Sequence, residues 1–298
     1  MRVSELDDAQ PRPRRVAIGT FDGVHLGHRE VIRGSDTVLT FDPHPLAVIA
    51  PYALPKLIDS PAIKRDLIEG LGVEEMVVIR FDEVLARQRA EDFVREVLID
   101  CLGATNVSVG ENFRFGSRAQ GDAAMLARSS EFETTVVALV EADGETVSSS
   151  RIRALVAAGE VGPAARLLGR PYALEGIVVH GDGRGRELGM PTANIVPDDA
   201  LVHPGHGVYA ALAEGRGGTH AAAVNVGVRP TFETGRGLLV EPYLLDFSGD
   251  LYGQPLRLHF LERLRGERRF ESADELIVQM RADVEEARRI ASATVPSR

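Results

Sequence analysis

Apolar runs and helical patterns alternate along the first half of the chain. Ser60-Pro61 places an N-cap serine before a proline at the first helical position, which predicts a helix over 61–70. A second helix is predicted over 90–102, whereas residues 1–14 are polar and are expected to form a loose arm. Strands that alternate with helices predict a parallel sheet with helices on both faces. The strands are expected at 15–18, 37–41, 76–79, 106–110 and 134–140.

The pattern changes near residue 170. After two short helices, expected at 151–158 and 163–168, β-type runs follow one another without a helical pattern between them, which predicts an antiparallel sheet or a small barrel. We therefore expect one domain over 1–165 and a second over 170–298. The runs lie at 174–180, 207–213, 219–227, 238–247 and 255–262. A final helix is indicated by the capping box Ser272-Ala-Asp-Glu275 and by one apolar stripe, formed by Leu276, Met280, Val284 and Ala287.

Composition narrows the class of protein. The 298 residues are 44% apolar and carry a net charge of −10, which disfavours a nucleic-acid partner because phosphate binding needs clustered cations. No apolar run reaches the roughly 18 residues of a membrane span, and the amino end lacks a secretory signal, so no membrane partner is expected. The single cysteine, Cys101, cannot form an intrachain disulfide and favours a cytoplasmic location. Among the 34 basic residues only Lys56 and Lys64 are lysine, so contacts to phosphate are expected mainly from arginine.

A glycine-rich loop after the first predicted strand carries two histidines. In Gly19-Thr-Phe-Asp-Gly-Val-His25-Leu-Gly-His28 a strand ends at Ile18 and a helix begins near His28. Backbone N–H groups at a helix start, with glycines that allow close approach, suit a phosphate chain. His25 and His28 could then donate to the oxygens of a leaving pyrophosphate. The spacing alone also suits a metal pair or two ordinary loop histidines, but the position after a strand favours the phosphate interpretation.

Three other segments of the first half have weaker signals. In Ser148-Ser-Ser-Arg-Ile-Arg153 the serines can cap a helix, and Arg153 adds a fixed positive charge. Taken alone, this segment favours an ordinary N-cap with a solvated arginine. Thr40-Phe-Asp-Pro-His-Pro45 is by itself a rigid turn, and Phe113-Arg-Phe115 by itself two core aromatics around a surface charge.

A second glycine-rich segment opens the other half. Residues 179–194 hold four spaced glycines that could close a loop over phosphates, without the Gly-Lys-Ser/Thr of a Walker A loop. Thr192 and Asn194 offer hard oxygen ligands suited to Mg²⁺. A mobile hairpin loop is the alternative when the segment is considered alone.

Glu241 interrupts an apolar strand. A carboxylate in this position needs a partner or a chemical role, unless it points outward from the strand. Pro242 beside it predicts a strand edge or a bulge.

Together these segments resemble a known family. Gly19–His28 resembles the HxGH signature of the nucleotidylyltransferase superfamily, and its context resembles the bacterial bifunctional riboflavin kinase/FAD synthetases. Residues 179–194 resemble the riboflavin kinase signature. Further segments agree in order, and the resemblance covers almost the whole chain. They are Thr40–Pro45, Gly110–Gly116, Ser148–Arg153, Pro204–Tyr209, Asn225–Thr231, Val240–Phe247 and Tyr252-Gly253.

The resemblance implies a Rossmann-like nucleotidylyltransferase domain over 1–165 and a six-stranded antiparallel β-barrel with a C-terminal helix over 170–298. It implies that the barrel domain phosphorylates riboflavin to FMN with ATP, and that the first domain adenylylates FMN to FAD with release of pyrophosphate. Mg²⁺ is the expected cofactor, and riboflavin, FMN and ATP are the expected partners.

The resemblance also assigns roles. Glu241 would be the base of the kinase, Thr192 and Asn194 would hold the metal, and His25, His28 and Arg153 would stabilise adenylyl transfer. Residues expected to bind ATP or its phosphates are Gly19, Phe21, Asp22, Gly23, Ser148, Ser149, Ser150, Gly181, Gly183, Gly185 and Gly189. Residues expected to bind the flavin are Asp42, Asn112, Phe113 and Arg229.

Two features depart from the family pattern. Only 11 residues, 29–39, separate His28 from Thr40, so the helix is limited to about two turns that stop at Gly34 and is expected to lose packing against the sheet. Glu111-Asn112 stands where the family has an apolar residue and aspartate.

Three alternative functions therefore stay open. They are a riboflavin kinase with an inactive first half, an adenylyltransferase for another phosphorylated small molecule, and a flavin- or nucleotide-binding regulator without turnover. The regulator is disfavoured because a protein that only binds its ligand needs neither a catalytic base such as Glu241 nor histidines that hold pyrophosphate.

Overall fold

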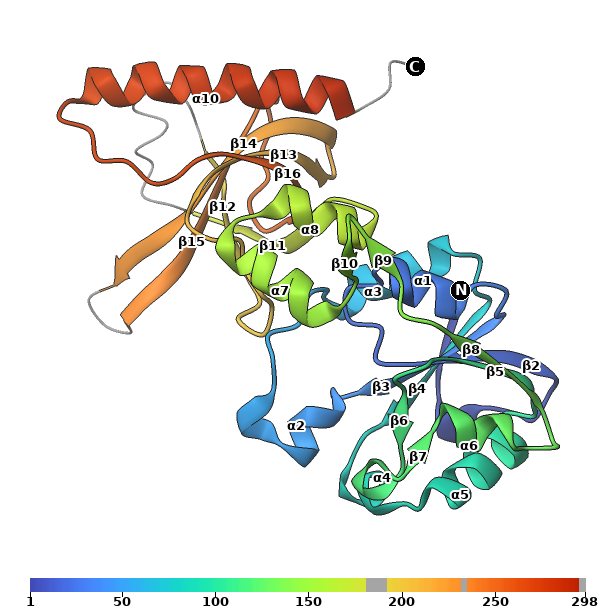
Figure 1. The fold of residues 1–298 in the computed structure, drawn as a ribbon. Coiled ribbons are helices and arrows are strands. Elements are labelled where there is room, and N and C mark those ends of the chain that lie inside the picture. The colour runs from blue at the N-terminus through green and yellow to red at the C-terminus, as the bar shows by residue number, and fades with distance from the viewer. Residues whose placement is uncertain (181–191, 232–234, 295–298) are drawn as a thin grey trace. The chain divides into compact units, whose positions relative to one another are not determined.

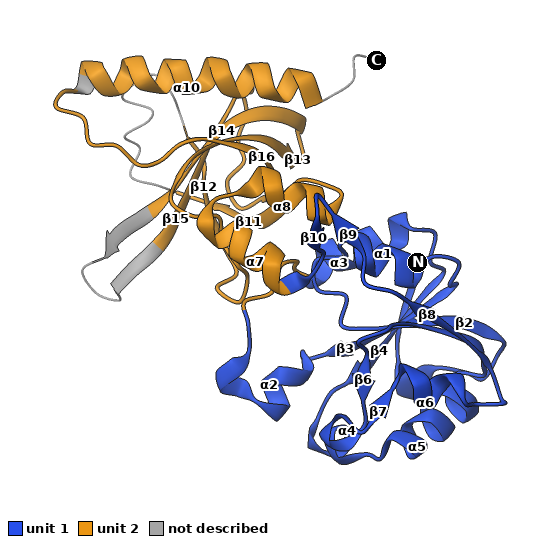
Figure 2. Ribbon diagram, in the orientation of Figure 1, with its two compact units in different colours: residues 1–55, 61–149 blue, residues 56–60, 150–298 orange. Residues whose placement is uncertain are grey.

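A computed structural model describes residues 1–180, 192–231 and 235–294 (Figure 1). The chain divides into two compact units (Figure 2). The first comprises residues 1–55 and 61–149, and the second comprises 56–60 and 150–298. This division falls between Ser149 and Ser150, ahead of the boundary expected near 165–171, and it assigns a short early segment to the second unit.

The first unit is built on a six-stranded parallel sheet with the strand order β1-β4-β3-β2-β5-β8. From β2 the chain passes through β3 to β4 on one side and then crosses to β5 and β8 on the other. The ends of β2 and β5 therefore meet at a topological switch point, where ligands of open α/β sheets bind. The strands are β1 (Arg2–Glu5), β2 (Arg14–Ile18), β3 (Thr37–Asp42), β4 (Glu75–Arg80), β5 (Ala104–Gly110) and β8 (Glu133–Val137).

Helices cover both faces of this sheet, as the sequence pattern predicts (Figure 1). Val16 and Ile18 of β2 pack with the helical stretch that contains Phe93, while Ala17 between them packs with Ile32 on the other face. This is the period-two alternation of a strand buried on both sides. The helices are α1 (Leu26–Ile32), α2 (Pro45–Ile49), α3 (Pro61–Gly70), α4 (Glu83–Arg87), α5 (Ala90–Asp92), the π-helix η3 (Phe93–Cys101) and α6 (Ala123–Ala127). Shorter elements are η1 (Leu6–Asp8), η2 (Pro51–Ala53), β6 (Arg114–Phe115), η4 (Ser117–Ala119), β7 (Gly121–Asp122), β9 (Glu141–Ala142) and β10 (Glu145–Thr146).

The expected loose arm at residues 1–14 is wrong, because it contains an edge strand. β1 pairs in parallel with β4, and Val3 at its centre is 46% exposed. A short edge strand with charged residues facing solvent carries no apolar alternation, so its sequence has the composition of a loop.

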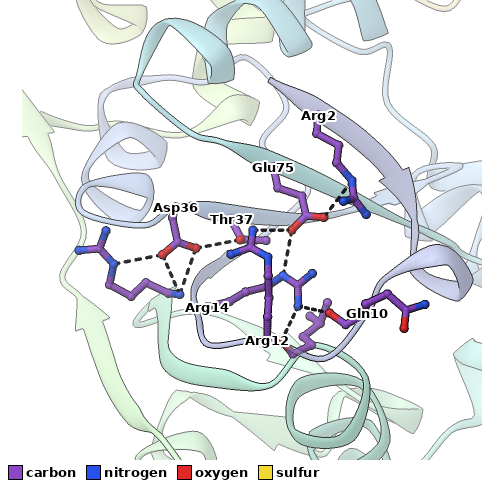
Figure 3. A network of polar contacts seen from close by, with 9 residues as sticks. Arg2, Gln10, Arg12, Arg14, Asp36, Thr37 and Glu75 are labelled. Atoms are coloured by element: carbon purple, nitrogen blue, oxygen red, sulfur yellow. Dashed lines mark hydrogen bonds and ion pairs between the residues drawn. The ribbon is translucent and has the colours of Figure 1, made fainter.

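The strand beginnings are joined by a buried ion network (Figure 3). The Arg14 Nε donates to Glu75 Oε2 at 2.9 Å, and both side chains are almost fully buried. Arg12 donates to the same oxygen at 2.9 Å, and Arg2 lies 3.5 Å from the other. Burial alone would raise the pKa of Glu75, but the hydrogen bonds and charges of Arg14 and Arg12 outweigh it and lower that pKa. The network ties the amino ends of β1, β2 and β4 together.

The short crossover after the glycine loop keeps its packing, so the expected loss of packing is wrong. α1 begins at Leu26, two residues before His28, and Gly34 with φ of +78° follows its end. Val31 and Ile32 are buried against the sheet, and the Ser108 hydroxyl donates to the Val31 carbonyl at 2.7 Å. A hydroxyl from β5 thus satisfies a carbonyl at the helix end, where no intrahelical partner exists.

The second unit is a closed six-stranded barrel with the order β11-β12-β15-β14-β13-β16 and antiparallel pairs. The sequence pattern predicts five of these strands and misses β12, which is only four residues long. The strands are β11 (Tyr172–Val179), β12 (Asn194–Pro197), β13 (Gly207–Gly215), β14 (Gly218–Thr231), β15 (Gly235–Leu244) and β16 (Pro255–Arg265). The helices are α7 (Ser149–Ala158), α8 (Val161–Leu168) and α10 (Ala273–Thr294).

Helix α10 packs on the outside of the barrel. Ala287 and Ile290 are buried against Ala210 and Ala223, and Val284 of the predicted stripe adjoins them. The Ser272 hydroxyl accepts the Glu275 N–H at 3.2 Å, as the capping box predicts. Across the residues described, no helix combines the length and apolar composition that a membrane crossing requires.

The segment 56–60 is fastened to the barrel unit by backbone and side-chain bonds. The Leu57 N–H donates to the Ala200 carbonyl at 2.8 Å, and Ile58 is fully buried. Buried Asp59 accepts from Arg170 at 2.6 Å. These five residues complete the second unit although they are distant from it in sequence.

Candidate active sites

The glycine loop lies at the carboxyl end of β2, at the switch point of the sheet. Its backbone is strained at Phe21 and Val24, which have φ of +49° and +37°, whereas Gly23 between them adopts φ of +92° without strain. Phe21 and Val24 are nonetheless buried, so packing holds the loop in this conformation. A Cβ at Gly19 would lie 3.0 Å from the Phe21 ring, which explains a glycine there.

Side chains from outside the loop hold three of its carbonyls. The Lys64 Nζ donates to the Thr20 carbonyl at 3.0 Å. The Ser149 hydroxyl donates to the Asp22 carbonyl at 2.8 Å. The Arg29 Nε donates to the Val24 carbonyl at 3.3 Å. The loop is therefore pre-organised before a ligand arrives.

The two histidines stand together at the start of α1. His25 is the N-cap, and its Nδ1 accepts the His28 N–H at 3.2 Å. Their rings stack with centroids 3.6 Å apart at 16°, and the Phe21 ring meets His28 edge-on at 5.4 Å. A Cβ at Gly27 would lie 3.2 Å from the His25 ring, so this position favours glycine. Because Nδ1 of neutral His25 is an acceptor, its Nε2 carries the proton and can donate.

Both imidazoles are neutral at pH 7. Burial lowers the pKa of His25 to about 4. Burial also lowers the pKa of His28 well below its usual value, with further contributions from His25 and Lys64. The pair can therefore donate hydrogen bonds to phosphate oxygens but supplies no positive charge.

The serine motif is divided between the two units. Ser148 directly precedes α7, and Ser149 holds the glycine loop as described above. Ser150 and Arg153 belong to the second unit, where an Arg153 guanidinium nitrogen lies 3.4 Å from the Ser150 hydroxyl. A role for these two residues beside the histidines stays a prediction.

The expected flavin residues of the first unit follow the carboxyl ends of its strands. Asp42 ends β3, and Asn112 and Phe113 follow β5, on the same edge of the sheet as the glycine loop. The Phe113 ring stacks on Phe115 at 5.6 Å and adjoins the core. The Glu111 carboxylate accepts the Leu139 N–H at 3.0 Å, which gives this departure from the family pattern a structural role.

The second site is a row of side chains across three barrel strands. Asn225 of β14 pairs with Glu241 of β15, and its amide lies 3.4 Å from the Glu241 carboxylate. Ile195 of β12 pairs with Val240, and the Ala193 N–H donates to the Pro242 carbonyl at 2.9 Å. This register sets Asn194 opposite Glu241.

Asn194, Glu241 and Asn225 therefore share one face of the sheet. Ile195, Val240, Val224 and Val226, which alternate with them, are buried. The row thus lies on the outer face of the barrel wall.

Pro242 marks neither an edge nor a bulge, contrary to expectation. β15 lies between β12 and β14, and its pairing with β14 runs without a register shift. Proline is accommodated because β12 begins at Asn194, so the pairing on that side ends where the missing N–H would be needed.

Asn194 has the character of a metal ligand. It is 6% exposed, and its Oδ1 has no hydrogen-bond partner among the residues that the structure describes. A buried amide oxygen without a partner is costly, and it is a hard ligand suited to a divalent cation. Thr192, two residues earlier, is partly buried. The residues present fit a divalent metal beside Glu241.

Several predicted residues lie outside the described parts of the chain. These are Gly181, Gly183, Gly185 and Gly189, together with the side chain of Arg229. Next to the glycine segment, the His180 ring stacks on Tyr252 with centroids 3.7 Å apart.

Sequence reasoning missed two residues that touch these sites, Lys64 and Asn225. Lys64 could have been noticed because a lysine in the first turn of a helix opposes the helix dipole. Asn225 begins a segment that resembles the family, but only the strand register shows that it lies beside Glu241.

Both halves of the chain match known families of nucleotide-using transferases. The FAD synthetase family model matches residues 7–151, and the riboflavin kinase family model matches residues 168–291. The chain belongs to the family of bifunctional riboflavin kinase/FMN adenylyltransferases, with the FAD synthetase part first and the kinase part second. Both reactions use ATP and generally need a divalent metal.

Relatives match over nearly their whole length. The bifunctional riboflavin kinase/FMN adenylyltransferase of Listeria monocytogenes is 35% identical over 92% of this chain and 91% of its own. That of Bacillus subtilis is 36% identical over 91% and 90%. A crystal structure described as a macrolide-efflux protein from Streptococcus pneumoniae is 32% identical and has a TM-score of 0.89, covering 97% of this chain and 99% of its own.

Proposed function

We propose that the barrel site phosphorylates riboflavin to FMN and that the glycine-loop site converts FMN to FAD. The observation that carries the proposal is the presence of two separately built sites, one in each unit. In the first, a histidine pair caps a helix at the sheet's switch point. In the second, Asn194 and Asn225 flank Glu241.

In the kinase reaction, the 5′-oxygen of riboflavin attacks the γ-phosphorus of ATP, and ADP leaves. Glu241 accepts the proton of that 5′-hydroxyl during the attack. The Asn225 amide orients the carboxylate from the neighbouring strand. Glu241 is partly buried, and a carboxylate positioned at the hydroxyl can act as a general base.

A divalent cation, which we propose to be Mg²⁺, would be held by Asn194 Oδ1 and the Thr192 hydroxyl. When bound, it would offset negative charge on the ATP phosphates. Gly181, Gly183, Gly185 and Gly189 would close over these phosphates, and Arg229 would contact the flavin.

In adenylyl transfer, a phosphate oxygen of FMN attacks the α-phosphorus of ATP and pyrophosphate leaves. The protein supplies no nucleophile, so its contribution is positioning and charge stabilisation. His25 would donate from Nε2 to a phosphate oxygen, and the N–H groups of the loop 20–23 would face the phosphate chain. Ser148, Ser150 and Arg153 would add contacts to ATP, and Asp42, Asn112 and Phe113 would bind the flavin.

The test supplies riboflavin, ATP and Mg²⁺ and separates FMN from FAD by chromatography. The proposal expects both products, with FMN appearing before FAD. FMN alone would mean that the first half is inactive, and neither product would favour a binding protein. FMN supplied in place of riboflavin tests the second step separately.

We also propose that each unit carries one of the two activities and can perform it without the other. We propose in addition that the enzyme is cytoplasmic. A fragment of residues 149–298 keeps α7 and α8 whole and is expected to make FMN but no FAD, although it lacks the segment 56–60 and should therefore be less stable than the complete unit. A fragment that starts at residue 165 cuts α8 and removes buried Val161 and Ala164, so it should unfold at a lower temperature. FAD made by either fragment would contradict the division.

A further inference from the structure

Lys64 lies beside the histidine pair, on an element outside the signature loop. It stands in the first turn of α3, between buried Ile63 and the rest of a helix anchored by Ile68. Its Nζ lies 3.0 Å from the Thr20 carbonyl, within the glycine loop. The backbone of the loop thus fixes the position of an ammonium group at the site.

The positive charge of Lys64 destabilises the helix in which it lies. The first turn of a helix carries partial positive charge, so a cation there is unfavourable, and α3 has no acidic residue in that turn. Residues that break a local rule are expected mainly at functional or strained sites. A hydrogen bond to a carbonyl such as that of Thr20 can also be made by an uncharged donor.

The site needs a positive charge that its histidines do not provide. Both imidazoles are neutral at pH 7, whereas the leaving pyrophosphate carries several negative charges. The charge of Lys64 reaches this site, because it contributes to lowering the pKa of His28. An ammonium is a compact point charge of the kind that binds phosphate without a planar partner.

We propose that Lys64 belongs to the adenylyl-transfer site and supplies a fixed positive charge that binds the β- and γ-phosphates of ATP. This inference rests on the proposed FAD synthesis. As the FMN oxygen bonds to the α-phosphorus, the bond from that phosphorus to the bridging oxygen breaks, and the electron pair stays on pyrophosphate. Lys64 stabilises the charge that develops there.

Three substitutions separate the charge of Lys64 from its hydrogen bond. Lys64→Gln keeps an N–H donor for the Thr20 carbonyl but removes the charge. Lys64→Arg keeps the charge, and Lys64→Met removes both. Each variant is assayed for FAD formation from supplied FMN, for inhibition by added pyrophosphate, and for FMN formation from riboflavin.

If the charge of Lys64 binds the phosphates, the Gln and Met variants form FAD about tenfold to hundredfold more slowly than the unmodified enzyme. Pyrophosphate also inhibits these two variants correspondingly less. The Arg variant keeps more activity than either, and FMN formation is unchanged in all three. Full activity of Lys64→Gln would overturn the inference, because the hydrogen bond alone would then suffice. Unchanged inhibition by pyrophosphate would overturn it as well.

Lys56→Met is the matched control. Lys56 also donates to a backbone carbonyl, that of Asp199, but within the second unit, so its loss should leave FAD formation and pyrophosphate inhibition unchanged. An unmodified enzyme that makes no FAD would refute the proposed function itself, a result distinct from failure of the Lys64 variants.

Discussion

The two sites are assembled over very different distances in sequence. The histidine pair and its strained loop lie within residues 19–28, whereas Asn194, Asn225 and Glu241 come from three barrel strands and meet only through their register. A shift of one residue in that register would turn Glu241 to the opposite face. The histidine loop of the first site is therefore encoded locally, whereas the second site depends on the pairing of the barrel strands.

Removing the base of the barrel site should give the largest effect. We expect Glu241→Gln to reduce FMN formation about 10²- to 10⁴-fold, since a positioned general base is lost while size and hydrogen bonding are kept. FAD formation from supplied FMN should be unchanged, because the other site is built separately. Chromatography of both products measures this.

The control for Glu241 is Glu262→Gln, the same change at an exposed glutamate on β16. It should leave both activities unchanged. If Glu241→Gln phosphorylates riboflavin within a few-fold of the unmodified enzyme, the carboxylate is not the base.

The next largest effect is a loss of stability at the amino ends of the sheet strands, where the Glu75 ion network lies. Glu75→Ala leaves buried Arg14 without its carboxylate partner and should cost about 3–5 kcal/mol of the free energy of unfolding. Because Glu75 belongs to the first unit, FAD formation should be lost on heating before FMN formation. Denaturant unfolding and the two activities after heating measure this.

Glu83→Gln is a suitable comparison, because Glu83 forms an exposed pair with Arg87 at 2.6 Å. Such a pair contributes at most about 0.5 kcal/mol. Equal loss of stability in the two variants would show that the network of Figure 3 adds little.

The sequence predicts the alternation of strands and helices in the first unit and the barrel character of the second, because burial on two faces and on one face leave distinct patterns. It misses β1 and β12, two four-residue strands too short for a pattern to emerge. It also misjudges the packing of α1, since the hydroxyl that completes the helix end comes from Ser108, 77 residues away.

The same distinction applies to the candidate sites. Contiguous motifs place His25, His28 and Asn194 as candidates, because helix starts and glycine loops carry local signals. The contacts of Lys64 with Thr20 and of Asn225 with Glu241 depend on tertiary packing and strand register. No local pattern contains that information, which is why both residues were missed.

In the glycine-loop site, a substitution can separate the role of His25 as a hydrogen-bond donor to phosphate from its role as a helix cap. His25→Asn keeps a side-chain acceptor at the N-cap but changes the donor that faces the phosphates. We expect FAD formation to fall about 10²- to 10³-fold, with FMN formation and the melting temperature little changed. His44→Asn, at the histidine that caps α2, controls for the effect of this exchange on capping stability. A His25→Asn enzyme with full FAD synthesis would remove the histidine from the mechanism.

The smallest expected effect is the pH dependence that the buried imidazole of His25 confers. Its pKa is about 4 in the folded protein because of burial, against 6.5 for the exposed side chain. Between these values the unfolded chain binds a proton that the folded protein excludes, so stability falls as the pH falls below 6.5 and levels off below about 4. From pH 7 to pH 5 this one group should remove about 2 kcal/mol of the free energy of unfolding.

NMR titration of the His25 ring protons, assigned by their loss in His25→Asn, measures the pKa directly. Denaturant unfolding at pH 7 and pH 5 measures the consequence, and the difference between the two pH values should be about 2 kcal/mol smaller in His25→Asn than in the unmodified protein. A midpoint near 6.5 would contradict the structure in a specific way. It would mean that the glycine loop opens to water in the free protein, and that the site encoded most locally in the sequence is ordered only when its phosphate ligand binds.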